Sequence, residues 1–142
     1  MIYDGANIWV TDTPSKLLKL DADGAVLQTV TLSFGVQHPV FDGTNLWVPS
    51  GDSSLVTVVR ASTGAVIATL TGNGLSFPSG GAFDGQRVLF VSVDTETLSL
   101  WKAADLTVLG SVTMTSQGPR IPCSDGIHFW IPMFGSNKLA RF

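Results

Sequence analysis

Three aspartates at corresponding positions along the chain have the greatest potential for metal chemistry. Asp12, Asp52 and Asp94 each lie in a polar loop that follows an apolar run. Carboxylate and carbonyl oxygens are the ligands that hard cations such as Ca²⁺ prefer, so three converging loops of this kind could hold one. Loop carboxylates are more commonly solvated surface groups, however. We therefore expect these aspartates to be exposed, and we predict no metal and no cofactor.

The histidines and the cysteine offer less potential for chemistry than these aspartates. His38 is the better placed of the two histidines, but a lone histidine is more often a hydrogen-bonded structural residue than a general base or a ligand. Catalytic zinc needs three protein ligands, and two histidines with one cysteine in different surroundings do not supply them. Cys123 is the single cysteine, which excludes an internal disulfide. It lies in an apolar run, so we expect a buried, inert thiol.

A second set of aspartates recurs too, and here a turn explains the recurrence. Asp4, Asp42, Asp84 and Asp125 each precede a glycine, at intervals of 38, 42 and 41 residues. The Asp-Gly pair readily supplies the backbone angles of a tight hairpin turn. A tryptophan follows three of these aspartates five residues later. We interpret those tryptophans, Trp9, Trp47 and Trp130, as packing residues between sheets and not as a sugar-stacking platform.

These turns belong to a repeated unit that must position everything else. Copies of the stretch at 41–48 recur at 3–10, 83–91 and 124–131. A period of about 40 to 45 residues, built from short apolar runs, is typical of one four-stranded propeller blade per repeat. The apolar spacing of a helical repeat is absent. We therefore predict an all-β fold in a single domain, residues 1–142, with repeats at approximately 1–38, 39–80, 81–121 and 122–142.

The strands expected within each repeat show that the last one is incomplete. Three repeats carry four strand-like runs each, which predicts three complete four-stranded blades. The fourth repeat has runs only at 122–125, 129–133 and 138–142, so its outer strand is missing and 15 strands are expected. The third repeat differs in two positions: its turn at 103–106 lacks a glycine, and Leu89 stands where the others have tryptophan, a volume that Trp101 could fill.

The repeated motifs resemble a known family. The stretch Phe-Asp-Gly-Thr-Asn-Leu-Trp-Val at 41–48, with Leu-Asp-Ala-Asp-Gly-Ala-Val-Leu at 20–27 and Ser-Thr-Gly-Ala-Val-Ile at 62–67, resembles the bacterial YVTN-type and NHL-like β-propeller repeats. The resemblance covers essentially the whole chain and implies a ring of about seven blades. Because related propellers include metal-assisted lyases and lactone hydrolases, it also implies such an enzyme as an alternative function.

Any ligand site is expected at the mouth of the central channel. Two kinds of loop, those entering the innermost strands and those joining the second and third strands, should gather there on one face of the propeller. In the enzyme alternative, His38, Arg120 and the loop aspartates would have to converge on the channel axis. The candidate ligand-binding residues are Gln37, His38, Asn73, Ser79, Gln117 and Arg120, with Asp12, Asp52 and Asp94 as the metal candidates.

Composition limits the partners. The net charge is −3 and charged residues make up 13% of the chain, with the lysines and arginines scattered singly, so we expect no nucleic-acid binding. No apolar stretch is long enough for a membrane-spanning helix, and we expect no membrane insertion. The first residues already form a predicted strand, so we expect no signal peptide in this chain. The uncharged surface would suit an extracellular, envelope or virion component.

An open stack of blades leaves two end faces and one strand edge uncovered. Each face measures on the order of 300 Å² in projection, a size at which apolar patches become interaction sites. Several copies could join into one ring of about eight blades, one chain could close a tight four-bladed ring, or the blades could belong to a longer protein; an added strand from another chain could also complete the fourth blade. The expected interface residues are Met1, Ile2, Tyr3, Lys138, Leu139, Ala140, Arg141 and Phe142.

We favour self-association among these arrangements, because so little of the surface is charged. The predicted function is a non-catalytic propeller module for binding or assembly, completed by further copies into a homo-oligomeric ring or by a partner chain. The enzyme alternative stays open at this point.

Overall fold

The first two blades are complete four-stranded antiparallel sheets. The structure, a computed structural model, describes residues 1–115 and 118–142. In each sheet the strands follow one another in chain order. The first blade consists of β1 (Ile2–Tyr3), β2 (Ile8–Asp12), β3 (Lys16–Leu20) and β4 (Val26–Thr31). The second consists of β5 (Val40–Phe41), β6 (Asn45–Ser50), β7 (Leu55–Arg60) and β8 (Val66–Thr71).

The third blade is also complete, and the fourth has three strands. The third blade consists of β9 (Pro78–Phe83), β10 (Arg87–Ser92), β11 (Thr97–Lys102) and β12 (Val108–Thr113). The fourth consists of β13 (Cys123–Ser124), β14 (Phe129–Met133) and β15 (Lys138–Arg141), with a 3₁₀ turn, η1 (Phe134–Ser136), before its last strand. The prediction of three full blades and a partial fourth is confirmed. Within residues 1–115 and 118–142, no helix has the length and apolar character that crossing a bilayer requires.

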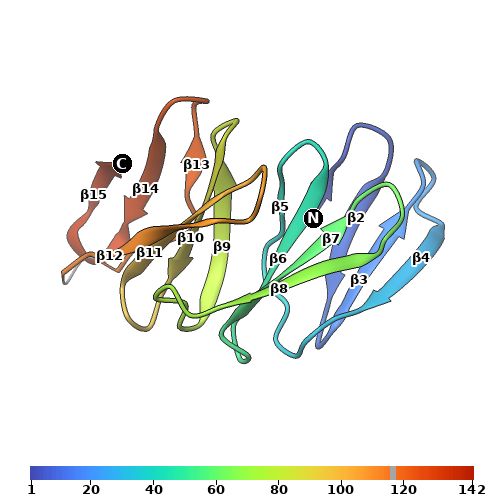
Figure 1. Cartoon of the computed structure of the whole chain (residues 1–142), viewed down its shortest axis with the longest axis horizontal. Coiled ribbons are helices and arrows are strands. Elements are labelled where there is room, and N and C mark those ends of the chain that lie inside the picture. The colour runs from blue at the N-terminus through green and yellow to red at the C-terminus, as the bar shows by residue number, and fades with distance from the viewer. Residues whose placement is uncertain (116–117) are drawn as a thin grey trace.

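The blades stand side by side in chain order, with the first and fourth at opposite ends of the row (Figure 1). Three separate clusters of buried apolar side chains hold them together, one at each junction between neighbouring blades. In the described part of the chain, no cluster joins the fourth blade to the first. The stack is therefore open, and the tight four-bladed ring, one of the arrangements left open above, is not formed.

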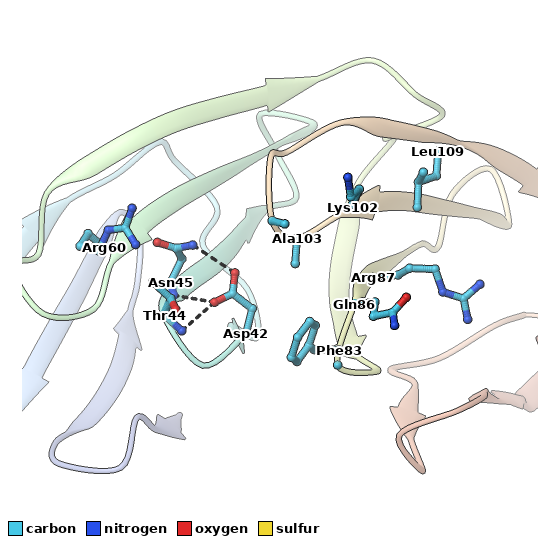
Figure 2. Close-up of a pocket in the computed structure, with 12 residues that line it drawn as sticks. Asp42, Thr44, Asn45, Arg60, Phe83, Gln86, Arg87, Lys102, Ala103 and Leu109 are labelled. Carbon is cyan, nitrogen blue, oxygen red and sulfur yellow. Dashed lines mark hydrogen bonds between the residues drawn. The ribbon is translucent and has the colours of Figure 1, made fainter.

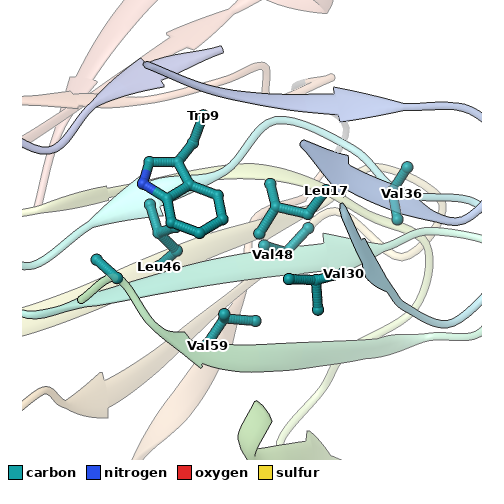
Figure 3. Close-up of a cluster of buried hydrophobic side chains, with 8 residues drawn as sticks. Trp9, Leu17, Val30, Val36, Leu46, Val48 and Val59 are labelled. Carbon is teal, nitrogen blue, oxygen red and sulfur yellow. The ribbon is translucent and has the colours of Figure 1, made fainter. Parts of the chain in front are cut away.

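The junction of the first two blades shows how this packing works. Trp9 is fully buried beside Leu46 and Val48 of the second blade (Figure 3). The corresponding Trp47 of the second blade packs in the next cluster, near Phe90 and Trp101 of the third blade. Each tryptophan thus reaches forward to the following blade, as the packing interpretation of these residues requires.

In three of the four blades, one aspartate fixes both the inner turn and the tryptophan. Asp42 Oδ1 accepts hydrogen bonds from the backbone N–H groups of Thr44 and Asn45, at 2.8 and 2.6 Å. Its Oδ2 accepts the Trp47 indole N–H at 2.7 Å. The glycine after the aspartate has φ +92°, which the Asp-Gly turn predicts. The sequence predicted the turn, but the bond to the indole was missed. The same indole bond joins Asp4 to Trp9 and Asp125 to Trp130.

The third blade differs from the first two at the tryptophan position and in the turn after its third strand. With Leu89 in the tryptophan position, Asp84 Oδ2 instead accepts a hydrogen bond from Nε of Arg87, at 2.7 Å. Leu89 packs toward the fourth blade, whereas Trp101 packs toward the second, so Trp101 does not fill the volume of the missing tryptophan. In the turn without glycine, Leu106 itself adopts the left-handed conformation, with φ 62°. Non-glycine residues meet steric resistance there, so this turn is strained.

The first prediction concerns the aspartate that joins turn and indole. Asp42→Ala should lower the free energy of unfolding by about 1–3 kcal/mol, because the buried indole N–H of Trp47 loses its acceptor. Urea denaturation followed by tryptophan fluorescence measures the change. Asp94→Ala is the matched control, since Asp94 is an exposed loop carboxylate, and it should stay within about 0.5 kcal/mol of the wild type. Equal losses in both variants would contradict this role of Asp42.

The second prediction concerns pH. Burial raises the pKa of Asp84, but the hydrogen bonds from Arg87 and Gln86 and the charge of Arg87 outweigh it, so the pKa lies below its ordinary value of 3.8. A carboxyl with a lowered folded-state pKa stabilises the fold fully above the unfolded value and loses that effect as the pH falls below it. The melting temperature should therefore drop below about pH 4, and less steeply in Asp84→Asn than in Asp94→Asn. Parallel curves for the two variants would refute the prediction.

Candidate functional site

Parts of the loops that enter the innermost strands lie close together. A methyl group placed on Gly80 would lie 3.1 Å from the Ile121 side chain and 3.4 Å from Cβ of His38. These residues belong to the loops or inner strands of the second, third and fourth blades. Of the predicted residues, His38 and Ser79 are in contact, whereas Gln37 and Arg120 adjoin His38 and Ile121 in the sequence. Gln117 lies outside the described residues.

Most of the side chains in this group already have structural partners. Asn73 donates its amide N–H to the Leu100 carbonyl at 3.1 Å, which ties the loop to the third blade. The Ser79 hydroxyl lies 3.4 Å from the Val91 carbonyl. Arg120 donates to its neighbour Pro119 at 3.3 Å and places its guanidinium 5.3 Å from the centre of the Phe134 ring. These contacts give each residue a role in the fold that needs no ligand.

His38 and Gln37 differ from these residues, because their contacts with the rest of the protein are made by their backbone N–H groups. The His38 N–H points to the Ser79 carbonyl at 3.4 Å, and the Gln37 N–H donates to the Pro49 carbonyl at 2.8 Å. The His38 side chain is exposed. In the described part of the chain no carboxylate forms an ion pair with it. An arrangement in which an acid orients His38 as a general base is therefore absent from the described residues.

The metal candidates do not converge. Asp12, Asp52 and Asp94 are all exposed, as expected of solvated loop carboxylates. Among residues 1–115 and 118–142, no three histidine, cysteine, aspartate or glutamate side chains gather closely enough to hold an ion. The enzyme alternative needs His38, Arg120 and these aspartates to converge, and the described residues lack that convergence.

Cys123 is exposed, so the expectation of a buried thiol was wrong. Cys123 pairs with Trp130 across the fourth blade, and the two side chains share the face that points away from the third blade. Among residues 1–115 and 118–142, no blade covers that face. The apolar run in the sequence does not show which face of its strand another blade covers.

Part of the exposed apolar surface lies on the two end faces of the stack, and part lies on the outer strands β4, β8 and β12. On the first blade, Tyr3 is 62% exposed and Ile8 and Val10 are half-buried. Met1, Tyr3 and Ile8 line a hollow of about 530 Å³ there. On the fourth blade, Trp130 is half-buried, whereas Trp9 and Trp47 are fully buried. In the described residues no blade packs against either of these faces.

The predicted interface residues divide into two groups. Met1, Tyr3 and Leu139 are large apolar residues with high exposure, and Lys138 and Arg141 are exposed on the outermost strand. Ile2 and Ala140 are partly buried and pack against the first and third internal clusters, and Ile2 also lines the hollow on the first blade. Phe142 exchanges backbone hydrogen bonds with Phe129, at 2.9 and 3.0 Å, and thereby extends the last strand pair.

A second hollow, which the sequence did not predict, lies between the second and third blades (Figure 2). Its volume is about 570 Å³. It opens among the inner hairpin turns and the turns that follow the third strands, whereas the predicted mouth is built from the other loops of each blade. The available signal was a basic residue ending the third strand of two consecutive blades, Arg60 and Lys102. The residues that line it are Asp42, Thr44, Asn45, Arg60, Phe83, Gly85, Gln86, Arg87, Lys102, Ala103, Ala104 and Leu109.

Solved structures with a similar fold include several β-propellers. A catalytically inactive virginiamycin B lyase from Staphylococcus aureus, solved with quinupristin, matches with a TM-score of 0.78 at 17% identity, over 95% of this chain and 48% of that one. The WD40 repeats of RRP9 match with a TM-score of 0.77 at 17% identity, over 98% and 48%. The β-propeller domain of Cps50 (Swd1) matches with a TM-score of 0.77 at 12% identity, over 96% and 49%.

These likenesses establish the propeller fold, and at such identities they establish nothing further. The resemblance to YVTN- and NHL-like propellers is confirmed at that level. The chain spans about half the length of the structures it matches. No protein-family model matches the chain, and no curated protein matches it.

Proposed function

We propose that the chain is a non-catalytic β-propeller module for binding or assembly, and that a second copy of the chain covers its end faces. In this arrangement the fourth blade of one copy packs against the first blade of the other. Two such junctions would join two copies into one ring of nearly eight blades. Head-to-tail contacts of this kind give closed rings when the rotation between copies fits.

The observation that carries the proposal is the equivalence between an inner junction and the end faces. Trp9 of the first blade packs in one cluster with Phe41, Leu46 and Val59 of the second. By strand register, Tyr3, Ile8 and Leu20 hold the corresponding positions on the open face of the first blade. That face therefore repeats the surface that receives a tryptophan inside the chain.

The fourth blade supplies the matching tryptophan. Trp130 follows Asp125 as Trp9 follows Asp4, and its indole N–H donates to Asp125 Oδ2 at 2.8 Å. It is thus held in the same way as the buried tryptophans, but it points toward open solvent. The hollow of about 530 Å³ beside Tyr3 and Ile8 has room for an indole ring. Burying such surface on both partners supplies an apolar driving force for association.

Two further features support the proposal. The matched propellers are about twice as long as this chain, so two copies would supply a comparable number of blades. Charged residues are only 13% of the sequence, which leaves large uncharged areas for contact. A place in a virion or cell-envelope assembly fits the same uncharged surface and is the wider setting that we propose. No specific observation favours the lyase or hydrolase alternative.

The third prediction tests this association. Size-exclusion chromatography with light scattering should give a mass about twice the 15.0 kDa of one chain. Trp130→Glu and Tyr3→Glu should each shift the protein toward 15.0 kDa, because each places a charge in the proposed junction. Val108→Glu is the control, since Val108 is exposed on the outer strand of the third blade and should leave the mass unchanged.

A wild-type protein of 15.0 kDa at all concentrations would overturn the proposal. A dimer that neither end-face variant weakens would retain association but reject this mode of packing. Circular dichroism of each variant separates lost association from lost folding, because an unfolded variant loses its β signal whereas a monomeric one keeps it.

A further inference from the structure

The hollow between the second and third blades has charged walls and an apolar base. Arg60 comes from the second blade, and Lys102 comes from the opposite wall on the third (Figure 2). Phe83, Ala103 and Leu109 contribute apolar surface between and beside them. The lining residues include three cations, Arg60, Arg87 and Lys102, and a single acid, Asp42. Its volume of about 570 Å³ falls in the range of small-molecule sites.

The charged side chains that line the hollow differ in how far they are already paired with other groups of the protein. Asp42 accepts four hydrogen bonds from the protein, so both of its oxygens are engaged. Arg87 is paired with Asp84 and lies over the Phe129 ring of the fourth blade, at 5.2 Å. Lys102 has an exposed partner in Asp105, at 2.9 Å. Such exposed pairs are weak and are readily exchanged for another anion.

Arg60 is the exception among these cations. Within the described residues its guanidinium has no carboxylate partner and no side-chain hydrogen bond, although the residue is half-buried. The turn after Lys102 contains Asp105, whereas the turn after Arg60, at 61–64, contains no acid. A half-buried guanidinium without an anionic partner is costly in a folded protein and calls for an explanation.

The equivalent junction between the first and second blades is filled by the protein itself. There Lys19 donates to the Ala61 carbonyl at 3.3 Å and lies 5.3 Å from the centre of the Trp9 ring. Gln28 reaches across to the Thr63 carbonyl at 3.1 Å. The hollow at that junction is correspondingly smaller, about 360 Å³. The larger hollow is therefore a specific feature of one junction and does not follow from the fold.

We propose that this hollow binds a small organic carboxylate with an apolar body. The carboxylate would accept charge-assisted hydrogen bonds from Arg60, and the charge of Lys102 on the opposite wall would add a longer-range attraction. The apolar body would cover Phe83, Ala103 and Leu109. This site is separate from the end faces, so it does not depend on the proposed self-association.

The fourth prediction uses 3-phenylpropionate as the probe. In a ¹H–¹⁵N correlation titration it should shift the backbone amides of Asn45, Gln86 and Ala103, and the neutral 3-phenylpropionamide should bind about tenfold more weakly. Arg60→Gln should raise the dissociation constant of the carboxylate about tenfold and Lys102→Gln severalfold. Lys138→Gln, which changes an exposed lysine of the fourth blade, is the matched control and should bind like the wild type.

Three outcomes would overturn the inference. Equal binding of the carboxylate and the amide would remove the role of charge, and equal affinities of Arg60→Gln and Lys138→Gln would remove the role of Arg60. Shifts confined to the end-face residues Tyr3, Ile8 and Trp130 would place the probe on the surface that we assign to the second copy. The dispersion of each variant's spectrum reports whether it is folded, so a loss of binding through unfolding is recognised directly.

Discussion

Face-to-face packing of neighbouring blades is the interaction on which the rest of the structure depends. A single four-stranded sheet has two faces, and the described residues form no α-helix that could cover either, so another sheet buries them. The central strands show the effect directly. β6 is buried along its whole length and β10 along nearly all of it, whereas β2 and β14, in the end blades, alternate between buried and more exposed positions. The same repeat therefore becomes core or surface according to its place in the row.

The aspartate before each inner turn connects this packing to the backbone. Its first oxygen closes the turn, and in three blades its second holds the indole that enters the next blade. Such a link makes the position of the tryptophan depend on a correctly formed turn, so local and long-range structure agree. In the third blade Arg87 donates the hydrogen bond to the aspartate, and Leu89 packs against the next blade. The two roles can therefore be carried by separate residues.

The sequence was sufficient for the fold because its signals are local and repeated. Asp-Gly turns and short apolar runs located the strands to within a few residues, and the missing outer strand of the fourth blade followed from the same count. The site was less predictable. Exposure of Cys123 depends on whether a blade covers its face, and the amide of Asn73 is engaged by a carbonyl 27 residues away. The hollow near Arg60 depends on which side chains happen to bridge a junction, and no periodic pattern encodes that.

The two kinds of surface that remain differ in chemistry, and this difference argues for different partners. The end faces are broad and apolar, and they repeat a junction already present inside the chain, so a sheet of the same type is the partner that fits them. The hollow between the second and third blades is partly open, carries an excess of positive charge and lies among turns. Its size and charge fit a small anion. Because the central blades that form the hollow are also the ones packed on both sides, their geometry is fixed by the fold before any ligand arrives.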